Sequence, residues 1–235
     1  MKVLILAAGT GDRLGTLTNE LPKALVKVNG QELIHYQLEF LKDSRITQIG
    51  VVCGFQSNRL KAYLNERAPQ ITLFENPHFE KGSILTLKVG LPFLDNDFLL
   101  LNVDHIYPKK LLDHILKQVK GITACCDFDR PLVADDMKVK LDSKRQLKEI
   151  HKNLLDYDGG YIGMTYCPKS KLDIYRNGFE TVLGKLGEKV SVEMILGELA
   201  KNGEPIHIAN TSGIRWLEVD TLEDLKKAES EIKNI

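Results

Sequence analysis

The sequence lacks an excess of either charge, which limits its partners. It holds 32 lysine and arginine residues against 32 aspartate and glutamate residues, so the formal net charge is zero. Without an overall positive field we expect neither nucleic acid nor an anionic membrane surface as a partner. Any anionic ligand must therefore be held by local groups.

Cysteine is also scarce, and its spacing excludes two kinds of site. Cys53, Cys125, Cys126 and Cys167 form no C-x-x-C pair and have no histidine cluster beside them. This pattern argues against a zinc site and against a disulfide framework. We expect the four thiols to be reduced and mostly buried.

Long apolar runs are missing as well. No run reaches the roughly 18–20 residues that a membrane helix needs. Asp12 and Arg13 interrupt the first apolar run before it can form the hydrophobic part of a signal peptide. We expect a soluble, cytoplasmic protein with no direct insertion into a membrane.

The most informative segment of the sequence lies at its beginning. Lys2 to Ala7 is an apolar run that predicts a buried strand, and it leads directly into a glycine-rich loop. Ala7, Ala8 and Gly9 remove side-chain bulk where the strand ends, so backbone groups can approach a ligand closely. Gly9 and Gly11 allow a tight loop whose amides can line an anion.

Two basic residues follow this loop. Arg13 offers a planar fork for phosphate oxygens, and Lys23 offers a compact charge directly after Pro22. The spacing fits neither a Walker loop, which needs G-x-x-x-x-G-K-[ST], nor the dinucleotide fingerprint G-x-G-x-x-G, and the residues after the loop are not helix-like. The segment therefore predicts a different way of holding a nucleoside triphosphate.

Strands and helices alternate along the chain, which predicts an α/β fold with a doubly wound, mostly parallel sheet. We expect a single domain over residues 1–235, with a small β-rich insertion at about residues 122–164. Ser57 is expected at the N-cap of its helix. The expected strands cover 2–7, 46–53, 71–75, 98–103, 206–209 and 215–219, and the expected helices cover 32–42, 57–66, 83–91, 109–119, 171–186, 192–201 and the charged C-terminal stretch.

Two aspartates end expected strands. Asp104 follows 98–103 and Asp220 follows 215–219. Because ligands of parallel sheets bind at the carboxyl ends of strands, the pair predicts a Mg²⁺ site completed by substrate phosphates. For Asp220 a structural alternative stays open, namely an N-cap for the last helix with Glu223 as its capping partner.

The segment LAAGTGDRLGTLTNELPKALVKVNGQELI resembles the N-terminal signature of the sugar-phosphate nucleotidyltransferases. It matches that signature nearly position by position from Leu6 to Ile34, with Glu32 in place of the usual proline. The stretch WLEVDTLEDL near the C-terminus resembles the closing motif of the same superfamily, which holds a second metal-binding aspartate.

The resemblance implies a role for each matching residue. Arg13 and Lys23 would be catalytic, and Asp104 and Asp220 would hold Mg²⁺. The expected nucleotide contacts are Leu6, Ala7, Ala8, Gly9, Gly11, Gly82 and Ser83.

Within the superfamily, Asp104-His105-Ile106 is most similar to the S-D-H-(I/V) segment of CTP:inositol-1-phosphate cytidylyltransferases. By this resemblance Lys152 would contact the acceptor phosphate, and Asp158 would face the acceptor or order the site. His151 replaces a glycine of that group's I-G-K motif. His105 is not assigned a proton-transfer role.

The expected reaction joins CTP and inositol-1-phosphate to CDP-inositol and pyrophosphate, and a separate membrane enzyme would use the product. A phosphocholine cytidylyltransferase or another sugar-1-phosphate nucleotidyltransferase is the first alternative. Choline would need an aromatic or acidic cage, for which Trp216, Tyr107, Tyr157 and Tyr161 are candidates. Inositol hydroxyls would need polar groups such as Asp158, Asn153 and His105. A non-catalytic nucleotide-binding regulatory module is the alternative from another class.

Overall fold

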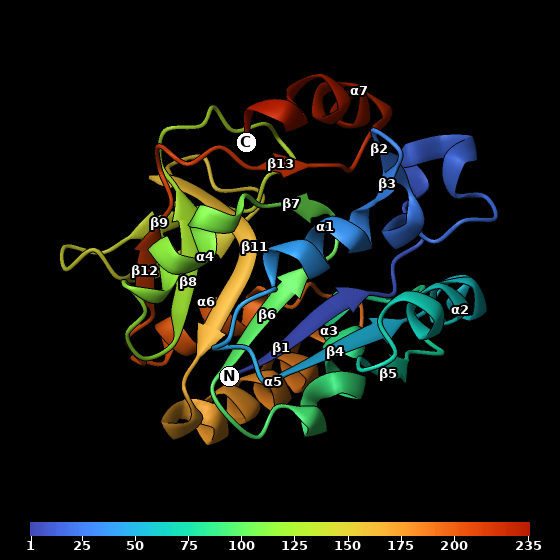
Figure 1. Ribbon diagram of the computed structural model, residues 1–235. Helices are drawn as coiled ribbons and strands as arrows, with labels where there is room; N and C mark the ends of the chain where they lie inside the picture. Colours follow the sequence, from blue (N-terminus) through green and yellow to red (C-terminus); the bar gives the residue numbers. More distant parts are fainter.

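The computed structural model describes residues 1–235 and is built around a mixed sheet of nine strands (Figure 1). Seven strands lie in the order β10-β9-β11-β6-β1-β4-β5, while β8 pairs with β11 and β12 pairs with β8. The nine strands are β1 (Lys2–Ala7), β4 (Gln48–Cys53), β5 (Thr72–Glu75), β6 (Phe98–Asn102), β8 (Thr123–Asp127), β9 (Lys138–Leu141), β10 (Leu147–His151), β11 (Gly159–Cys167) and β12 (His207–Asn210). Four short strands form two ribbons outside this sheet, β2 (Lys27–Val28) with β3 (Gln31–Glu32), and β7 (His105–Ile106) with β13 (Leu217–Glu218).

The half of the sheet that begins the chain is parallel, with β1 between β4 and β6 and β5 at the edge. Both faces of β1 are apolar because both are covered by helices. Val3 and Ile5 belong to the core under one helical layer, and Leu4 and Leu6 belong to the core under the other.

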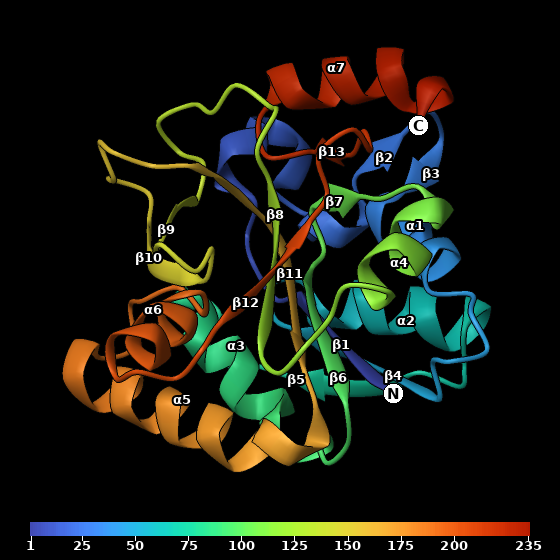
Figure 2. The same ribbon diagram turned by 90° about the vertical axis from the view of Figure 1, so that its left-hand side faces the viewer.

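Seven α-helices cover the molecule. They are α1 (Leu33–Phe40), α2 (Ser57–Arg67), α3 (Ser83–Gly90), α4 (Lys109–Leu116), α5 (Leu172–Leu186), α6 (Met194–Lys201) and α7 (Leu222–Glu231). Helices α1, α2 and α4 pack on one face of the sheet, and α3, α5 and α6 pack on the other (Figures 1 and 2). The expected α/β class and its doubly wound arrangement are confirmed.

The expected β-rich segment is continuous with the main sheet. Strand β11 runs antiparallel to β6, with Met164 opposite Leu101, and also pairs with β8 and β9. Its register to β8 shifts between Tyr161 and Thr165, and Gly163 at this bulge has φ 72°. The bulge separates the end of β11 that pairs with β9 from the end that pairs with β6.

The C-terminal helix packs on part of the N-terminal quarter of the chain. Helix α7 lies over the ribbons β2–β3 and β7–β13 in both views (Figures 1 and 2). Leu225 and Ala228 of α7 share an apolar cluster with Leu14 and Leu33. This packing carries the segment before α7 to the N-terminal segment that holds Lys23.

Local details correct three expectations. Ser57 is the first residue of α2 rather than its N-cap, which is Gln56 with φ 49°; the Ser57 hydroxyl donates instead to Glu75 Oε1 at 2.6 Å. Asp12–Thr18, expected to be non-helical, forms a 3-10 helix with a break at Gly15. Helix α7 has Thr221 as its N-cap, in a capping box with Asp224.

The four cysteines are buried free thiols, as expected. Burial raises the pKa of the Cys53 and Cys167 thiols to about 12. Because the thiolate is the reactive form, these groups are unsuited to nucleophilic catalysis. Among the helices of the fold, none has both the length and the apolar character needed to cross a membrane.

Candidate active site

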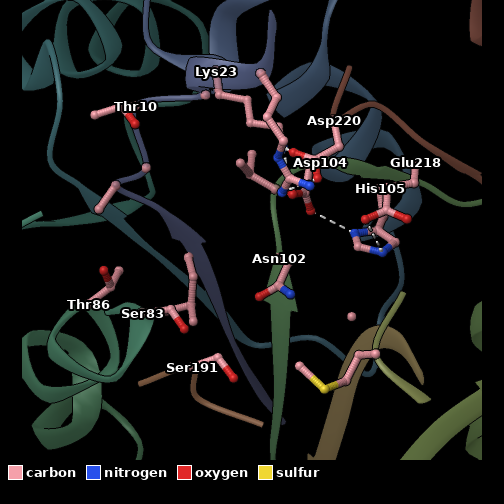
Figure 3. A pocket seen from close by; sticks show the side chains of 18 of the residues that line it. Thr10, Lys23, Ser83, Thr86, Asn102, Asp104, His105, Ser191, Glu218 and Asp220 are labelled. Carbon is pink, nitrogen blue, oxygen red and sulfur yellow. Dashed lines mark hydrogen bonds and ion pairs between the residues drawn. The ribbon is translucent and has the colours of Figure 1, made fainter. Parts of the chain in front are cut away.

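A cavity of about 750 Å³ opens where β1 and β6 end (Figure 3). Its walls come from the glycine-rich loop, the start of α3, the ends of β6 and β13, and the loop between β8 and β9. Polar side chains of the glycine-rich loop, of α3 and of the ends of β6 and β13 face it, as the labelled residues of Figure 3 show. The position agrees with the rule that open parallel sheets bind ligands at the carboxyl ends of their strands.

The glycine-rich loop forms one wall. Leu6, Ala8, Gly9 and Gly11 line the cavity as expected for nucleotide contacts, whereas Ala7 points into the core under α1, α2 and α4. Gly11 has φ 73°, and its carbonyl oxygen accepts a hydrogen bond from the Thr18 hydroxyl at 2.9 Å. Only a residue without a Cβ adopts this conformation without strain. The expected nucleotide contact of Ala7, which involves its backbone, stays a prediction.

Lys23 joins the two strand-end aspartates. Its Nζ atom donates to Asp104 Oδ2 at 2.8 Å and to Asp220 Oδ1 at 2.6 Å (Figure 3). The exposed fractions of the three side chains are only 9% for Lys23, 22% for Asp104 and 15% for Asp220. We call these three residues the buried triad.

Burial and the neighbouring charges shift the pKa values of Lys23 and Asp104 in opposite directions, and the effect of the charges is the larger. Burial disfavours the charged form of Lys23, but Asp104 and Asp220 raise the pKa of its amine. Burial likewise disfavours the Asp104 carboxylate, but Lys23 and His105 hold its pKa well below the usual range. Lys23 and Asp104 are therefore charged at neutral pH.

The local folds explain why both carboxylates face the cavity. Asp104 follows β6, and its carbonyl oxygen accepts a hydrogen bond from the Val219 N–H at 2.9 Å. Asp220 follows β13, and the capping box of α7 is formed by Thr221 and Asp224. The alternative in which Asp220 caps the last helix with Glu223 as its partner is therefore wrong. The carboxylate of Asp220 instead faces the cavity, where its two oxygens pair with Lys23 and Arg13.

The residues present fit a magnesium ion. Two carboxylates from distant parts of the chain converge on one positively charged atom, Lys23 Nζ. Hard oxygen ligands of this kind suit Mg²⁺, which is usually bound by one or two carboxylates together with substrate phosphates. Asp104 and Asp220 would hold the ion, which would neutralise phosphate charge.

A second group of charges lies toward solvent. Asp135, in the loop between β8 and β9, forms ion pairs with Arg13 and with Lys152 Nζ, the latter at 2.9 Å. Arg13 also pairs with Asp220, so it connects this group to the buried triad. The side chains of Arg13, Asp135 and Lys152 are 49%, 54% and 42% exposed. We call Arg13, Asp135 and Lys152 the exposed triad.

Across the cavity from these charges lie hydroxyl groups. Ser83 and Thr86 on α3, and Ser191 before α6, line the wall opposite Asp104 and Asp220 (Figure 3). The Ser83 hydroxyl oxygen accepts the backbone N–H of Val192 at 2.8 Å. Gly82, expected to contact the nucleotide, lies outside the cavity wall. A Cβ at Gly82 would lie 2.1 Å from the Val190 carbonyl oxygen, so this glycine allows two backbone segments to pack together.

Only one of the two residues expected at the acceptor lies in the cavity wall. Lys152 lines the cavity, but Asp158 does not. The Asp158 carboxylate accepts the Leu141 N–H at 2.7 Å and lies 3.6 Å from Lys140 Nζ, so it ties the end of β9 to the start of β11. Of the two roles considered for Asp158, contact with the acceptor is thus not supported, and ordering of nearby strands is.

Six further acidic residues that were not anticipated from the sequence line the cavity, namely Asp12, Glu80, Asp135, Asp136, Glu193 and Glu218. Asp135 pairs with both exposed cations, Glu193 Oε1 accepts the Asn102 side-chain amide at 3.1 Å, and Glu218 lies beside His105. Burial raises the pKa of Glu218. Glu218 stands two residues before Asp220 in an extended segment, where alternate side chains share a face, and this spacing could have indicated it.

Comparison with known protein families agrees with this geometry. The model of the MobA-like NTP transferase domain matches residues 3–161, which include the glycine-rich loop, Lys23 and Asp104. The chain belongs to the MobA-like NTP transferase family. It is therefore a member of a nucleotidyltransferase family, as the N-terminal signature indicates.

Individual relatives of this NTP transferase are similar over nearly its whole length. A bifunctional IPC transferase and DIPP synthase of Aquifex aeolicus is 31% identical over 96% of the chain, which matches 50% of that protein. The chain thus spans about half the length of this relative. A choline-phosphate cytidylyltransferase of Streptococcus pneumoniae is 26% identical, with 100% of the chain matching 99% of that protein.

The fold has a close structural counterpart. The inositol-1-phosphate CTP transferase of T. maritima superposes with a TM-score of 0.83 at 18% identity, covering 99% of this chain and 96% of that one. At this level of identity the likeness establishes the fold alone.

Proposed function

We propose that this NTP transferase is a Mg²⁺-dependent cytidylyltransferase that joins CTP and inositol-1-phosphate to CDP-inositol and pyrophosphate. The observation that carries the proposal is the buried triad. A lysine that follows a glycine-rich loop holds two strand-end carboxylates together inside a cavity of about 750 Å³. Lysine and a pair of carboxylates are the groups that transfer of a phosphate-linked nucleoside requires.

The chemistry needs charge neutralisation more than proton transfer. The acceptor is a phosphate monoester whose oxygens are largely ionised at neutral pH, so no strong general base is required. One of these oxygens attacks the α-phosphorus in line, and pyrophosphate leaves on the opposite side. Arg13 and Lys23 neutralise the triphosphate, while Asp104 and Asp220 hold the Mg²⁺ ion that offsets its charge.

Lys152 is the acceptor-phosphate residue in this proposal. It lines the cavity and faces Arg13 across the carboxylate of Asp135. Two cations on either side of one carboxylate form a position that an anionic phosphate can also occupy. Attack requires the acceptor phosphate to lie close to the triphosphate. Asp135 pairs with both Arg13 and Lys152, so the residue proposed for the triphosphate and the residue proposed for the acceptor lie near each other.

Similarity to known transferases supports the choice of CTP. The pneumococcal relative is a choline-phosphate cytidylyltransferase, and the T. maritima protein is an inositol-1-phosphate CTP transferase. We assign the base to the wall lined by Leu6, Ala8, Gly9, Ser83 and Thr86.

The aromatic rings favour a polyol over choline. A quaternary ammonium group needs free aromatic faces. Trp216 stacks on His105 at 5.3 Å and carries the Arg130 guanidinium 4.4 Å above its ring, so both faces are engaged. The hydroxyls of Tyr107 and Tyr161 bond to Ile162 O and Thr165 Oγ1, and Tyr157 lies outside the cavity wall. Glu218 and Glu193 remain in the cavity wall, where carboxylates suit the hydroxyls of inositol and also the cation of choline, so the preference for inositol rests on the engaged aromatic rings.

A non-catalytic nucleotide-binding module is the alternative. The buried triad argues against this alternative, because holding two carboxylates together inside a protein has a cost that simple nucleotide binding does not require.

The product of the proposed reaction, CDP-inositol, is an activated phosphate donor. We propose that a separate membrane enzyme uses it.

The test is pyrophosphate release with Mg²⁺ from CTP, UTP, ATP, GTP and dTTP, each combined with inositol-1-phosphate, phosphocholine and glucose-1-phosphate. We expect release with CTP and inositol-1-phosphate. Release with phosphocholine instead would overturn the acceptor assignment. CTP binding that is unchanged in EDTA, with no release in any combination, would favour the binding module.

A further inference from the structure

His105 lies within a column of aromatic rings. Its ring centroid is 5.6 Å from that of Tyr107 and 5.3 Å from that of Trp216, with interplanar angles of 17° and 24°. Phe40 extends the column beyond Tyr107, and the Arg130 guanidinium covers the outer face of Trp216. The imidazole of His105 is therefore fixed on both faces.

The neighbours of His105 are themselves fixed. The Tyr107 hydroxyl donates to Ile162 O at 2.5 Å, and Trp216 Nε1 donates to Asp127 Oδ2 at 2.9 Å. The edge of the imidazole fits against the bulge of β11, where a Cβ on Gly163 would lie 2.6 Å from His105 Cε1. Even the backbone is held, since Gln37 Nε2 donates to His105 O at 2.5 Å. These contacts hold the orientation of the ring.

This rigid ring contacts a residue of the buried triad. His105 Nδ1 lies 2.7 Å from Asp104 Oδ1, and because the carboxylate is ionised, Nδ1 is the donor (Figure 3). The other oxygen, Oδ2, accepts from Lys23 Nζ. The two oxygens of Asp104 thus have separate partners, and the histidine determines which of them faces the cation position.

We propose that His105 is a positioning residue for the Mg²⁺ site. Through the Nδ1–H bond it holds Asp104 so that Oδ2 faces the point shared with Asp220, and the aromatic column holds His105 in turn. This inference rests on the proposed function, because it assigns the cation position to Asp104 and Asp220. Partners that orient a metal ligand commonly affect metal affinity or activity by about 10- to 100-fold.

Three substitutions separate the hydrogen bond from the packing. His105→Asn and His105→Gln both remove the ring from the column. Asn places its amide nitrogen at the chain position of Nδ1, whereas Gln places it near that of Nε2. His105→Phe keeps a ring between Tyr107 and Trp216 but removes the donor. His114→Phe, at a histidine of α4 that lies outside the cavity wall and bonds to Gln118 and Asn210, is the matched control.

The readout is the dissociation constant of CTP, measured by calorimetry in Mg²⁺ and in EDTA without acceptor, together with the melting temperature. For the unaltered protein and for His114→Phe we expect Mg²⁺ to tighten CTP binding. His105→Phe and His105→Gln should lose roughly 10-fold or more of this tightening, with similar affinities in EDTA. His105→Asn should recover most of it, although its melting temperature falls with that of Gln.

The outcomes separate the two proposals. If the unaltered protein shows no effect of Mg²⁺ on CTP binding, the proposed function fails. If it shows the effect and His105→Phe keeps it in full, the positioning role is wrong. Equal losses in Asn and Gln would overturn the role as well, because they would assign the whole effect to packing. Comparing His105→Asn with His105→Gln tests the positioning role even if His105→Phe does not fold.

Discussion

The buried triad and the exposed triad occupy one cavity but differ in the order of their charges and in their contact with water. In the buried triad one cation, Lys23, lies between two carboxylates; in the exposed triad one carboxylate, Asp135, lies between two cations. The side chains of the first are at most 22% exposed, and those of the second are at least 42% exposed.

One cavity thus holds a set of ion pairs that is costly to break and a set that a substrate can replace. Removing one member of a buried ion pair is strongly destabilising, by about 3–5 kcal/mol, because it leaves an uncompensated charge. An exposed pair contributes only about 0.2–1 kcal/mol. Substrate phosphates can therefore replace Asp135 at Arg13 and Lys152 at little cost, while Asp104 and Asp220 keep their positions for a cation.

The largest effect should follow a change in the buried triad. Lys23→Ala removes the cation that we propose neutralises the triphosphate, so kcat should fall by at least about 10²-fold, the scale for loss of an electrostatic stabiliser. Pyrophosphate release measures turnover, and a thermal melt checks that the variant is folded. Lys27→Ala, at an exposed lysine of β2, is the control. Near-normal turnover of Lys23→Ala would contradict the site.

A change at the acceptor side should affect binding more than turnover. Lys152→Ala removes a charged partner of the acceptor phosphate, which is worth about 1.5–3 kcal/mol, so KM for inositol-1-phosphate should rise about 10- to 100-fold. KM for CTP should change little. Lys140→Ala, whose amine pairs with Asp156 and Asp158 outside the cavity, should leave both constants unchanged. A rise in KM for CTP alone would move Lys152 to the nucleotide.

Salt should distinguish the two triads without any substitution. Exposed charges are screened over about 8–10 Å at 0.1–0.15 M ionic strength, and buried ones much less. Raising KCl should therefore weaken acceptor binding more than it lowers kcat, as initial rates at several salt concentrations would reveal. If kcat declined while KM stayed constant, the distinction between the triads would be wrong.

The smallest effect should follow loss of the carboxylate that competes with phosphate. Asp135→Asn leaves Arg13 and Lys152 without their shared partner, so KM for either substrate should fall by about two- to fivefold, the range of an exposed ion pair. Steady-state kinetics would measure it, with Asp156→Asn as the control. An increase of tenfold in either KM would instead indicate that Asp135 binds substrate.

Much of the fold could be predicted because its signals are local. The apolar run of β1, the periodicity of helices such as α5, and the proline before α4 lie within the elements that they specify. The helix boundaries differ where tertiary contacts decide. Ser57, for example, bonds to Glu75 of a neighbouring strand instead of capping α2.

The candidate site was predictable to a lesser degree. Arg13, Lys23, Asp104 and Asp220 follow short motifs, and the structure brings all four into one cavity. Gly82 and Asp158 carry similar local patterns, but their contacts are with Val190 and with β9, which only the packing of distant segments reveals. Asp135 lies in a loop whose sequence gives no sign of the two cations that it meets.

The most direct test of the account is a ³¹P spectrum of the protein with CTP, inositol-1-phosphate and Mg²⁺. We predict the two coupled resonances of a new diphosphate ester together with pyrophosphate, and neither product in EDTA or with Asp104→Asn. Unchanged CTP and inositol-1-phosphate signals in the presence of Mg²⁺, from protein shown to bind CTP, would contradict the claim that this cavity transfers a cytidylyl group to inositol-1-phosphate.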